Sequence, residues 1–393
     1  MTVGAMVANI AAYLVALPAS RALGAVDYGV FGVVMAAMVI AAAPSMAVQA
    51  VIAREVVRGR PGLTTLGLRA AALVAMFSLV AGVVLVPLTR IPMSAAAAGL
   101  VMAPLITVTA AAQGFLQGRG QFHRLGWLLG LVGLLRSGPI IVALGLGAAA
   151  TGALWAGALG TLAAAGVAWS LLRISPSDTA KGSVPPDAHQ GNTFSSGAGV
   201  GSVLAASQVQ LALLVAVSLD LLLARVVLSA TDAGVYALGA VATKAAFWLP
   251  QAIGTVVYPR LAAPERDSRS LRMALGVVAG IGAVTVVGTW VLSPLVPRIV
   301  GEEYRPLTGI LWLFAATGAV LSLLALLLLA VIAVRRTTIG LAVWACTALE
   351  AVAILGWADS VTSLVAIAAT AATVMTALCL VAVISAERSS RRA

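Results

Sequence analysis

Long apolar runs separated by short polar connections cover almost the whole of this 393-residue chain. A helix needs about 20 mainly apolar residues to cross a hydrocarbon core about 30 Å thick. Twelve runs are long enough, at approximately residues 1–20, 28–52, 67–88, 94–115, 126–145, 150–172, 199–222, 233–256, 272–296, 307–333, 337–357 and 361–385. They lack the alternating polar positions of a barrel strand. The pattern therefore predicts an all-α polytopic membrane protein with twelve transmembrane helices.

The longest polar stretch divides the twelve runs into two sets of six. Residues 174–197 are rich in Pro, Gly and Ser, a composition that buries too little apolar area to order itself. We expect an N-terminal lobe at 1–173, a cytoplasmic linker at 174–197 and a C-terminal lobe at 198–393 with a short basic tail. Because six is even, both lobes enter the membrane in the same sense, which predicts a pseudo-two-fold axis along the membrane normal.

A segment of the first set recurs in the second, about two hundred residues later. The first copy has Arg21, then Asp27-Tyr-Gly-Val-Phe, and Pro44 followed ten residues later by Arg54. The second copy has the matching residues Arg225, Asp232-Ala-Gly-Val-Tyr, Pro250 and Arg260. Low-complexity apolar sequence would not repeat polar residues in this order, so we infer an internal duplication.

Composition and charge agree with this interpretation. The chain is 61% hydrophobic and only 9% charged, too little polar surface for a soluble protein of this size. With a cytoplasmic N-terminus, 17 of the 24 Lys and Arg residues fall on the cytoplasmic side, five on the other side and two inside spans. This bias predicts that both termini are cytoplasmic. The net charge of +11 then faces anionic membrane lipids, and we expect no nucleic-acid partner.

Several short matches give the chain a family resemblance. They are Arg-Ala-Leu-Gly at 21–24 with 27–31, and, in the second half, Asp-Leu-Leu-Leu-Ala-Arg at 220–225, 233–236, Lys244, Leu-Pro at 249–250 and Tyr-Pro-Arg-Leu at 258–261. Together they resemble the polysaccharide-export branch, the O-antigen-type flippases, of the multidrug/oligosaccharidyl-lipid/polysaccharide flippase superfamily. The similarity covers roughly residues 14–62 and 215–262; elsewhere only the number and spacing of spans match.

The resemblance implies a flippase of the bacterial cytoplasmic membrane. Its substrate would be a polyprenyl-diphosphate-linked oligosaccharide, moved to the outer leaflet by alternating access of two lobes for cell-surface polysaccharide synthesis. A polysaccharide polymerase or glycosyltransferases of the same pathway would be further partners. Two alternatives stay open: a cation-coupled small-molecule or drug exporter of the same superfamily, and a membrane enzyme or assembly scaffold.

Four ionisable residues inside spans are the first site candidates, because a charge at mid-membrane costs at least about 2.5 kcal/mol. Arg136 and Lys244 are candidate cavity cations for the substrate; Arg136 could instead pack or snorkel, and Lys244 could pair with a carbonyl or carboxylate. Glu350 is a candidate for proton or sodium coupling, or for an internal ion pair with Lys244 or Arg136. Asp220 is a second coupling candidate, although a local pair with Arg225 at the membrane edge is the simpler expectation.

Neutral residues give a second group of candidates. Gln49 and Gln208 could bind sugar hydroxyls, and interhelical hydrogen bonding explains them equally well. Pro44 and Pro250 are expected to bend their helices and to act as hinges.

Some chemistries lack the residues they need. The two cysteines, Cys346 and Cys379, lie in different predicted spans and have no metal or redox spacing. The two histidines, His123 and His189, lie in cytoplasmic connections and there is no Walker loop. We therefore expect no catalytic residues, metal site or cofactor, and a protein that is not an enzyme.

Overall fold

Helices make up the secondary structure of the described part of the chain. The computed structural model describes residues 2–174, 208, 211–261, 268–333 and 338–390. These residues form α-helices and short 3-10 helices, and there are no strands among them. Nine helical segments of this part are long and apolar enough to cross a membrane. The expected class, an all-α polytopic membrane protein, is confirmed.

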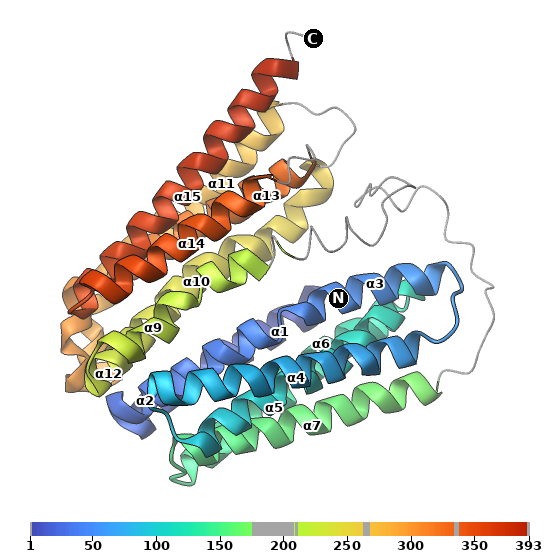
Figure 1. Ribbon diagram of the computed structural model, residues 1–393, viewed down its shortest axis with the longest axis horizontal. Helices are drawn as coiled ribbons and strands as arrows, with labels where there is room; N and C mark the ends of the chain where they lie inside the picture. The colour runs from blue at the N-terminus through green and yellow to red at the C-terminus, as the bar shows by residue number, and fades with distance from the viewer. Residues whose placement is uncertain (1, 175–207, 209–210, 262–267, 334–337, 391–393) are drawn as a thin grey trace. The chain divides into compact units, whose positions relative to one another are not determined.

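Contacts divide the chain into an N-terminal unit, Met1–Ser207, and a C-terminal unit, Gln208–Ala393 (Figure 1). The helices of the N-terminal unit are α1 (Thr2–Leu14), α2 (Ala16–Ala41), α3 (Pro44–Val57), α4 (Leu63–Thr89), α5 (Met93–Gly118), α6 (Phe122–Gly145) and α7 (Ala150–Ile174). Those of the C-terminal unit are a helical turn at 211–216, then α9 (Leu219–Val227), α10 (Ala230–Leu261), α11 (Ser268–Leu292), η2 (Ser293–Leu295), α12 (Val296–Ile299), η3 (Glu302–Gly309), α13 (Leu311–Ala333), α14 (Thr338–Trp357) and α15 (Val361–Ser390). The linker expected at 174–197 lies outside the described residues from 175 onward, so the lobe boundaries stay predictions.

The first two expected spans are divided differently from the helices. Gly24 lies inside α2 with φ 66° and ψ 171°, a conformation essentially restricted to glycine, so the chain turns there rather than continuing one helix. The first span is therefore α1 with the start of α2, and the second is the rest of α2 with α3. This explains why one apolar segment, Ile10–Val57, has 48 residues.

Helices pack in the same pairs in both units. In the N-terminal unit α5 packs against α3, α4 and α7, while α6 packs against α1 and α7. In the C-terminal unit α13 packs against α10, α11 and α15, while α14 packs against α9 and α15. The partners correspond in chain order, which is what a duplicated six-helix unit predicts.

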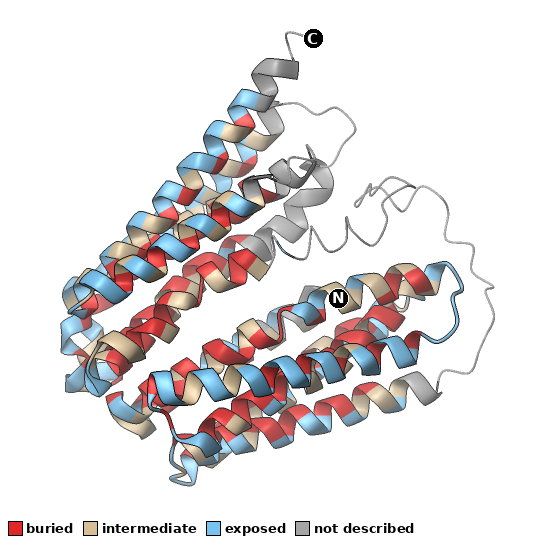
Figure 2. Cartoon of the chain, viewed as in Figure 1, coloured by how far each residue is buried: buried red, intermediate tan, exposed pale blue. Residues whose placement is uncertain are grey.

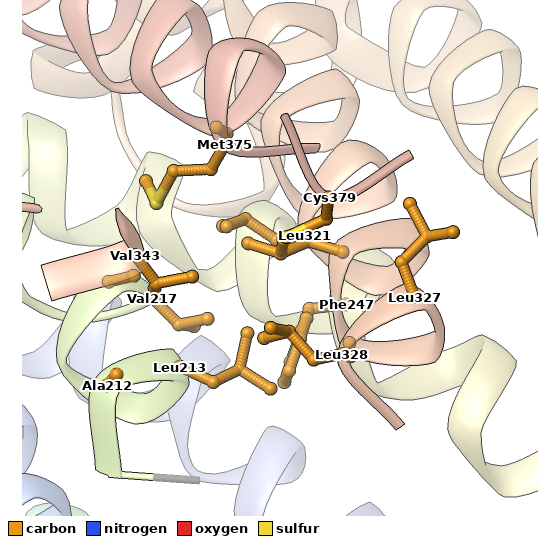
Figure 3. Packing of buried hydrophobic residues seen from close by; sticks show 14 of the residues in the cluster. Ala212, Leu213, Val217, Phe247, Leu321, Leu327, Leu328, Val343, Met375 and Cys379 are labelled. Atoms are coloured by element: carbon orange, nitrogen blue, oxygen red, sulfur yellow. The ribbon is translucent and has the colours of Figure 1, made fainter. Parts of the chain in front are cut away.

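The helices differ in how much of their surface they bury (Figure 2). Only 17% of the most apolar part of α4 and 6% of that of α11 are buried inside the protein. These helices expose large apolar side chains, such as Val83 and Val284, as a lipid-facing surface requires. One buried cluster joins the segment at 212–217 to α10, α13, α14 and α15 of the C-terminal unit (Figure 3) and includes Leu213, Val217, Phe247, Leu321, Leu324, Leu328, Val343, Met375 and Cys379.

Candidate functional site

A buried carboxylate in α9 forms the centre of the candidate site. Asp220 is only 4% exposed, and its Oδ2 accepts a hydrogen bond of 2.7 Å from the hydroxyl of Tyr236 in α10. Its Oδ1 accepts a second bond of 2.7 Å from the backbone N–H of Leu221. Arg225 donates a hydrogen bond of 3.2 Å to the carbonyl oxygen of Ala230, and its expected local pairing with Asp220 stays a prediction.

Two further ionisable groups interact with this carboxylate. The charge of Lys244 in α10 interacts favourably with that of Asp220, and Glu350 in α14 interacts unfavourably with it. Tyr236 is close enough to Glu350 to interact as well. We call Asp220, Tyr236, Lys244 and Glu350 the coupling cluster. The carboxylate whose charge acts on Lys244 is that of Asp220.

Helix direction explains how distant residues meet. At a rise of about 1.5 Å per residue, Asp220, Tyr236 and Glu350 lie about 10 to 14 Å from the connections at 228–229 and 358–360. Lys244 lies two turns further along α10 than Tyr236. Side chains on a helix lean toward its N-terminus, so the long Lys244 side chain points back toward Tyr236 and Asp220. Of the cluster, Glu350 lies in a helix, α14, that is long and apolar enough to cross a membrane.

The cluster is held by close packing between α10 and α13. The Tyr236 ring has no exposed surface and packs edge-on against Phe314 of α13, with ring centroids 5.0 Å apart. About one turn after Phe314 on α13, a Cβ on Gly318 would lie 2.0 Å from the carbonyl oxygen of Thr243. Only glycine therefore allows α13 to pack this closely against α10. Tyr236 is thus a fixed hydrogen-bond donor. A buried tyrosine usually finds a partner for its hydroxyl, and this signal could have identified it from the sequence.

Glu350 is the least satisfied member of the cluster. It is 4% exposed, and its Oε2 has no hydrogen-bond partner within the part of the chain that the structure describes. An unpaired buried acceptor costs free energy that a bound proton or metal cation would recover. The coupling cluster therefore contains one place where a cation can be accommodated.

Arg136 lies half-buried on α6, in the N-terminal unit. The helix continues through Ser137, Gly138 and Pro139, although proline leaves the carbonyl oxygen of Leu135 without its helical donor. Gly160 of α7 packs directly on that oxygen, where a Cβ would lie only 1.9 Å from it. Arg136 is therefore next to a weakened point of the helix backbone that α7 covers.

The glutamine and proline candidates have ordinary structural surroundings. Gln49 Nε2 donates a hydrogen bond of 3.1 Å to Oε1 of Gln117, which joins α3 to α5 as the interhelical interpretation expects. Gln208 is exposed, and its neighbours in sequence lie outside the described residues. Pro44 begins α3 directly after the break that ends α2, whereas Pro250 is buried inside α10. A hinge at either proline stays a prediction.

The two cysteines are closer in space than the sequence indicated. Cys346 of α14 and Cys379 of α15 line one small cavity of about 280 Å³, together with Ala342, Val343, Met375, Leu378 and Ala382. The lining is apolar apart from the two thiols. Both cysteines are free, and they belong to different helices, as the sequence predicts.

Comparison with known proteins identifies the fold. No family model and no curated relative matches the sequence. An inward-facing multidrug resistance MATE family transporter of the MOP superfamily matches with TM-score 0.62 and 15% identity, over 97% of this chain and 95% of that one. The MATE transporter VcmN of Vibrio cholerae, in a mutant form, matches with TM-score 0.58 and 17% identity over 99% and 96%.

A third solved structure differs in its described chemistry. A MOP superfamily transporter from Pyrococcus furiosus, reported to have a binding pocket of reverse polarity, matches with TM-score 0.54 and 13% identity over 97% of this chain and 93% of that one. Identities this low show the fold alone. They agree with the fold expected from the sequence and do not test the polysaccharide-export branch. The chain therefore has the fold of the MATE transporters of the MOP superfamily, with twelve helices in two lobes.

Proposed function

We propose that this protein is a secondary transporter whose ion-coupling site is the coupling cluster of its C-terminal unit. The observation that carries the proposal is the burial of Asp220 and Glu350, with the partly buried Lys244, among apolar helices of a transporter fold. Each charge inside a membrane costs about 2.5 to 3.5 kcal/mol on insertion scales, so residues of this kind are retained for function.

Coupling follows from the charges of the cluster. Lys244 balances one carboxylate, Asp220, while Glu350 has an oxygen without a partner among the described residues. Binding a proton or a sodium ion at Glu350 changes the net charge of the cluster by one unit. If that ion binds one conformation of the transporter more tightly, it shifts the population toward that conformation. The ion gradient then drives transport.

For the substrate we propose a polyprenyl-diphosphate-linked oligosaccharide, turned from the cytoplasmic to the outer leaflet of a bacterial cytoplasmic membrane. The family resemblance of the sequence supports this choice. Arg136 adds support, because a guanidinium inside a span can bind a diphosphate through paired hydrogen bonds. A polymerase or glycosyltransferases of the same pathway would then be functional partners.

Export of a small molecule or drug by cation exchange is the second candidate. The solved MATE structures favour it, since one is described as a multidrug resistance transporter. The two candidates share the coupling cluster and differ in the substrate. They also differ in the demand on Arg136, because an organic cation would be repelled by a fixed guanidinium while a diphosphate would be attracted.

Reconstitution of the full-length chain in liposomes tests both candidates. One set of vesicles contains a fluorescent polyprenyl-diphosphate disaccharide, whose exposure on the outer leaflet is measured by dithionite quenching. A second set contains ethidium, whose release is measured by its fluorescence. Each set is studied with a proton gradient, a sodium gradient or neither. Gradient-driven lipid inversion supports the flippase, and ethidium movement alone supports the exporter.

A matched pair of variants connects transport to the cluster. Glu350→Gln removes the unpaired buried carboxylate, whereas Glu302→Gln removes an exposed carboxylate that pairs with Arg305. We expect the first variant to lose dependence on the gradient and the second to behave as the wild type. The transport proposal would be refuted if no set of vesicles showed lipid inversion or ethidium movement.

A further inference from the structure

Three arginines share one buried carboxylate at the end of α3. Glu55 is 7% exposed, and Arg58 Nη1 donates a hydrogen bond of 3.1 Å to its Oε1. Arg60 Nε lies 3.0 Å from Oε2, and Arg54 Nε lies 3.5 Å from Oε1. One negative charge therefore serves three guanidiniums, and two positive charges remain unbalanced within the group.

The backbone fixes this arrangement. α3 ends in a Schellman motif, in which the N–H of Arg60 donates to the carbonyl of Glu55 at 3.2 Å and that of Gly59 to Val56 at 3.0 Å. Gly59 has φ 67°, the left-handed conformation that this motif requires. Arg58 and Arg60 therefore lie on either side of one tight turn, and both reach back to Glu55.

A fourth arginine reaches the same place from α5. Arg119 caps the C-terminus of α5 and lies over the ring of Phe115, 5.9 Å from its centroid. Phe115 packs in one cluster with Leu63, the first residue of α4. The preceding residue, Gly118, contacts the last turn of α3 at Ala53 and Val56. Arg119 is thus beside the turn that connects α3 to α4.

The group remains open on its outer side. The side chains of Arg58 and Arg60 are 47% and 68% exposed, so most of their N–H donors are free of the protein. Exposed apolar side chains lie next to them along the chain: Val57, Leu66 and Leu68 are 59%, 41% and 48% exposed. Preoriented guanidiniums beside apolar surface match a phosphate headgroup attached to acyl chains.

We propose that Arg58, Arg60 and Arg119 form a binding site for the phosphate headgroup of an anionic phospholipid, with Glu55 as the residue that positions the first two. The charge bias of the sequence places this end of α3 at the cytoplasmic surface, where anionic lipids are enriched. If exposed arginines were attracted to an anionic surface only by their charge, each of them would contribute equally to lipid binding. The shared carboxylate and the stacked Arg119 predict a defined site. This inference does not depend on the substrate that the protein transports.

Lipid titration of the purified full-length protein tests the proposal. The protein in neutral detergent is titrated with dihexanoyl phosphatidylglycerol, with dihexanoyl phosphatidylcholine and with inorganic phosphate. Binding is followed by thermophoresis, and the melting temperature reports folding. We expect saturable binding of phosphatidylglycerol alone. The double variant Arg58→Gln with Arg60→Gln should weaken it by about tenfold or more, and Arg119→Gln alone by about threefold.

The control removes the same charge elsewhere. Arg69→Gln with Arg272→Gln neutralises two exposed arginines in the second turns of α4 and α11, and we expect less than about a twofold change. Equal weakening in this control would reduce the effect to diffuse attraction and overturn the site. Phosphatidylcholine or inorganic phosphate binding as tightly as phosphatidylglycerol would also overturn it. Arg119→Gln is a single exposed change, which keeps the test decisive should the double variant not fold.

Discussion

The hydroxyl of Tyr236 donates a 2.7 Å hydrogen bond to the carboxylate of Asp220, and this bond connects α10 to α9 across sixteen residues of sequence. Both residues are almost completely buried. Tyr236→Phe should therefore leave Oδ2 of Asp220 without its donor. We expect a loss of about 1 to 3 kcal/mol in stability, measured as a lower unfolding midpoint in detergent.

A double-mutant cycle isolates this bond. If the hydrogen bond accounts for the loss, Asp220→Asn and Tyr236→Phe together should cost clearly less than the sum of the two single changes. Additive costs would show that the two residues stabilise the protein independently.

Lys244→Ala should stop transport while leaving the protein in the membrane. Its charge acts favourably on Asp220, so its removal leaves a buried carboxylate with less compensation and destabilises the protein. The double variant Lys244→Ala with Asp220→Asn should recover part of that stability without recovering transport. Membrane fractionation and the liposome assay measure the two effects. Normal transport in Lys244→Ala would remove this residue from the coupling cluster.

Arg136→Ala should distinguish the two proposed substrates. A flippase needs the guanidinium to bind diphosphate, so inversion of the labelled lipid should fall by about tenfold or more. An exporter of organic cations should keep its activity or gain some. Arg136→Lys provides the control, since it keeps the charge but loses the paired hydrogen bonds. Unchanged lipid inversion in Arg136→Ala would exclude a diphosphate contact there.

Gly160→Ala should separate α6 from α7. The new methyl group would meet the carbonyl oxygen of Leu135 at 1.9 Å and the ring of Pro139 at 3.0 Å, so one helix must move. Overpacking of this kind usually costs about 1 to 3 kcal/mol. The control is Gly166→Ala in the same helix, which has no atom within 4 Å of the added methyl group and should be neutral. Thermal unfolding of the two variants side by side makes the comparison.

Gly24→Ala should destabilise the N-terminal unit by about 1 to 3 kcal/mol, because φ 66° with ψ 171° is strained for any residue with a Cβ. Gly138→Ala is the control, since Gly138 is helical and has open space around it. The free energy of unfolding of both variants gives the measurement. Equal effects would mean that the chain does not turn at Gly24.

The sequence predicted the helices well because their lengths are dictated by the membrane. The apolar runs and the duplication depend on periodicity and composition, which are local properties. The break between the first two spans was placed correctly near Gly24, since Arg21 and Asp27 interrupt the apolar pattern there.

The candidate site could be predicted only in part. Lys244, Glu350 and Asp220 stood out because charged residues are rare in apolar spans, but their mutual contacts depend on which helix faces meet. Those faces are decided by close packing, such as Gly318 against Thr243, that low-complexity sequence does not specify. For the same reason Tyr236 was missed.

The first turn of the repeated segment lies at the same position in both units but is formed by different residues. The chain reverses at Gly24 in the N-terminal unit, and at the corresponding position in the C-terminal unit Ser229 caps α10, accepting from the N–H of Asp232 at 3.1 Å and donating to its Oδ2 at 2.7 Å. The same bend is thus formed by a glycine conformation in one copy and by hydrogen bonds of a serine side chain in the other. Relatives of this protein are therefore better recognised by the pattern of helix packing than by the residue types at the turns between helices.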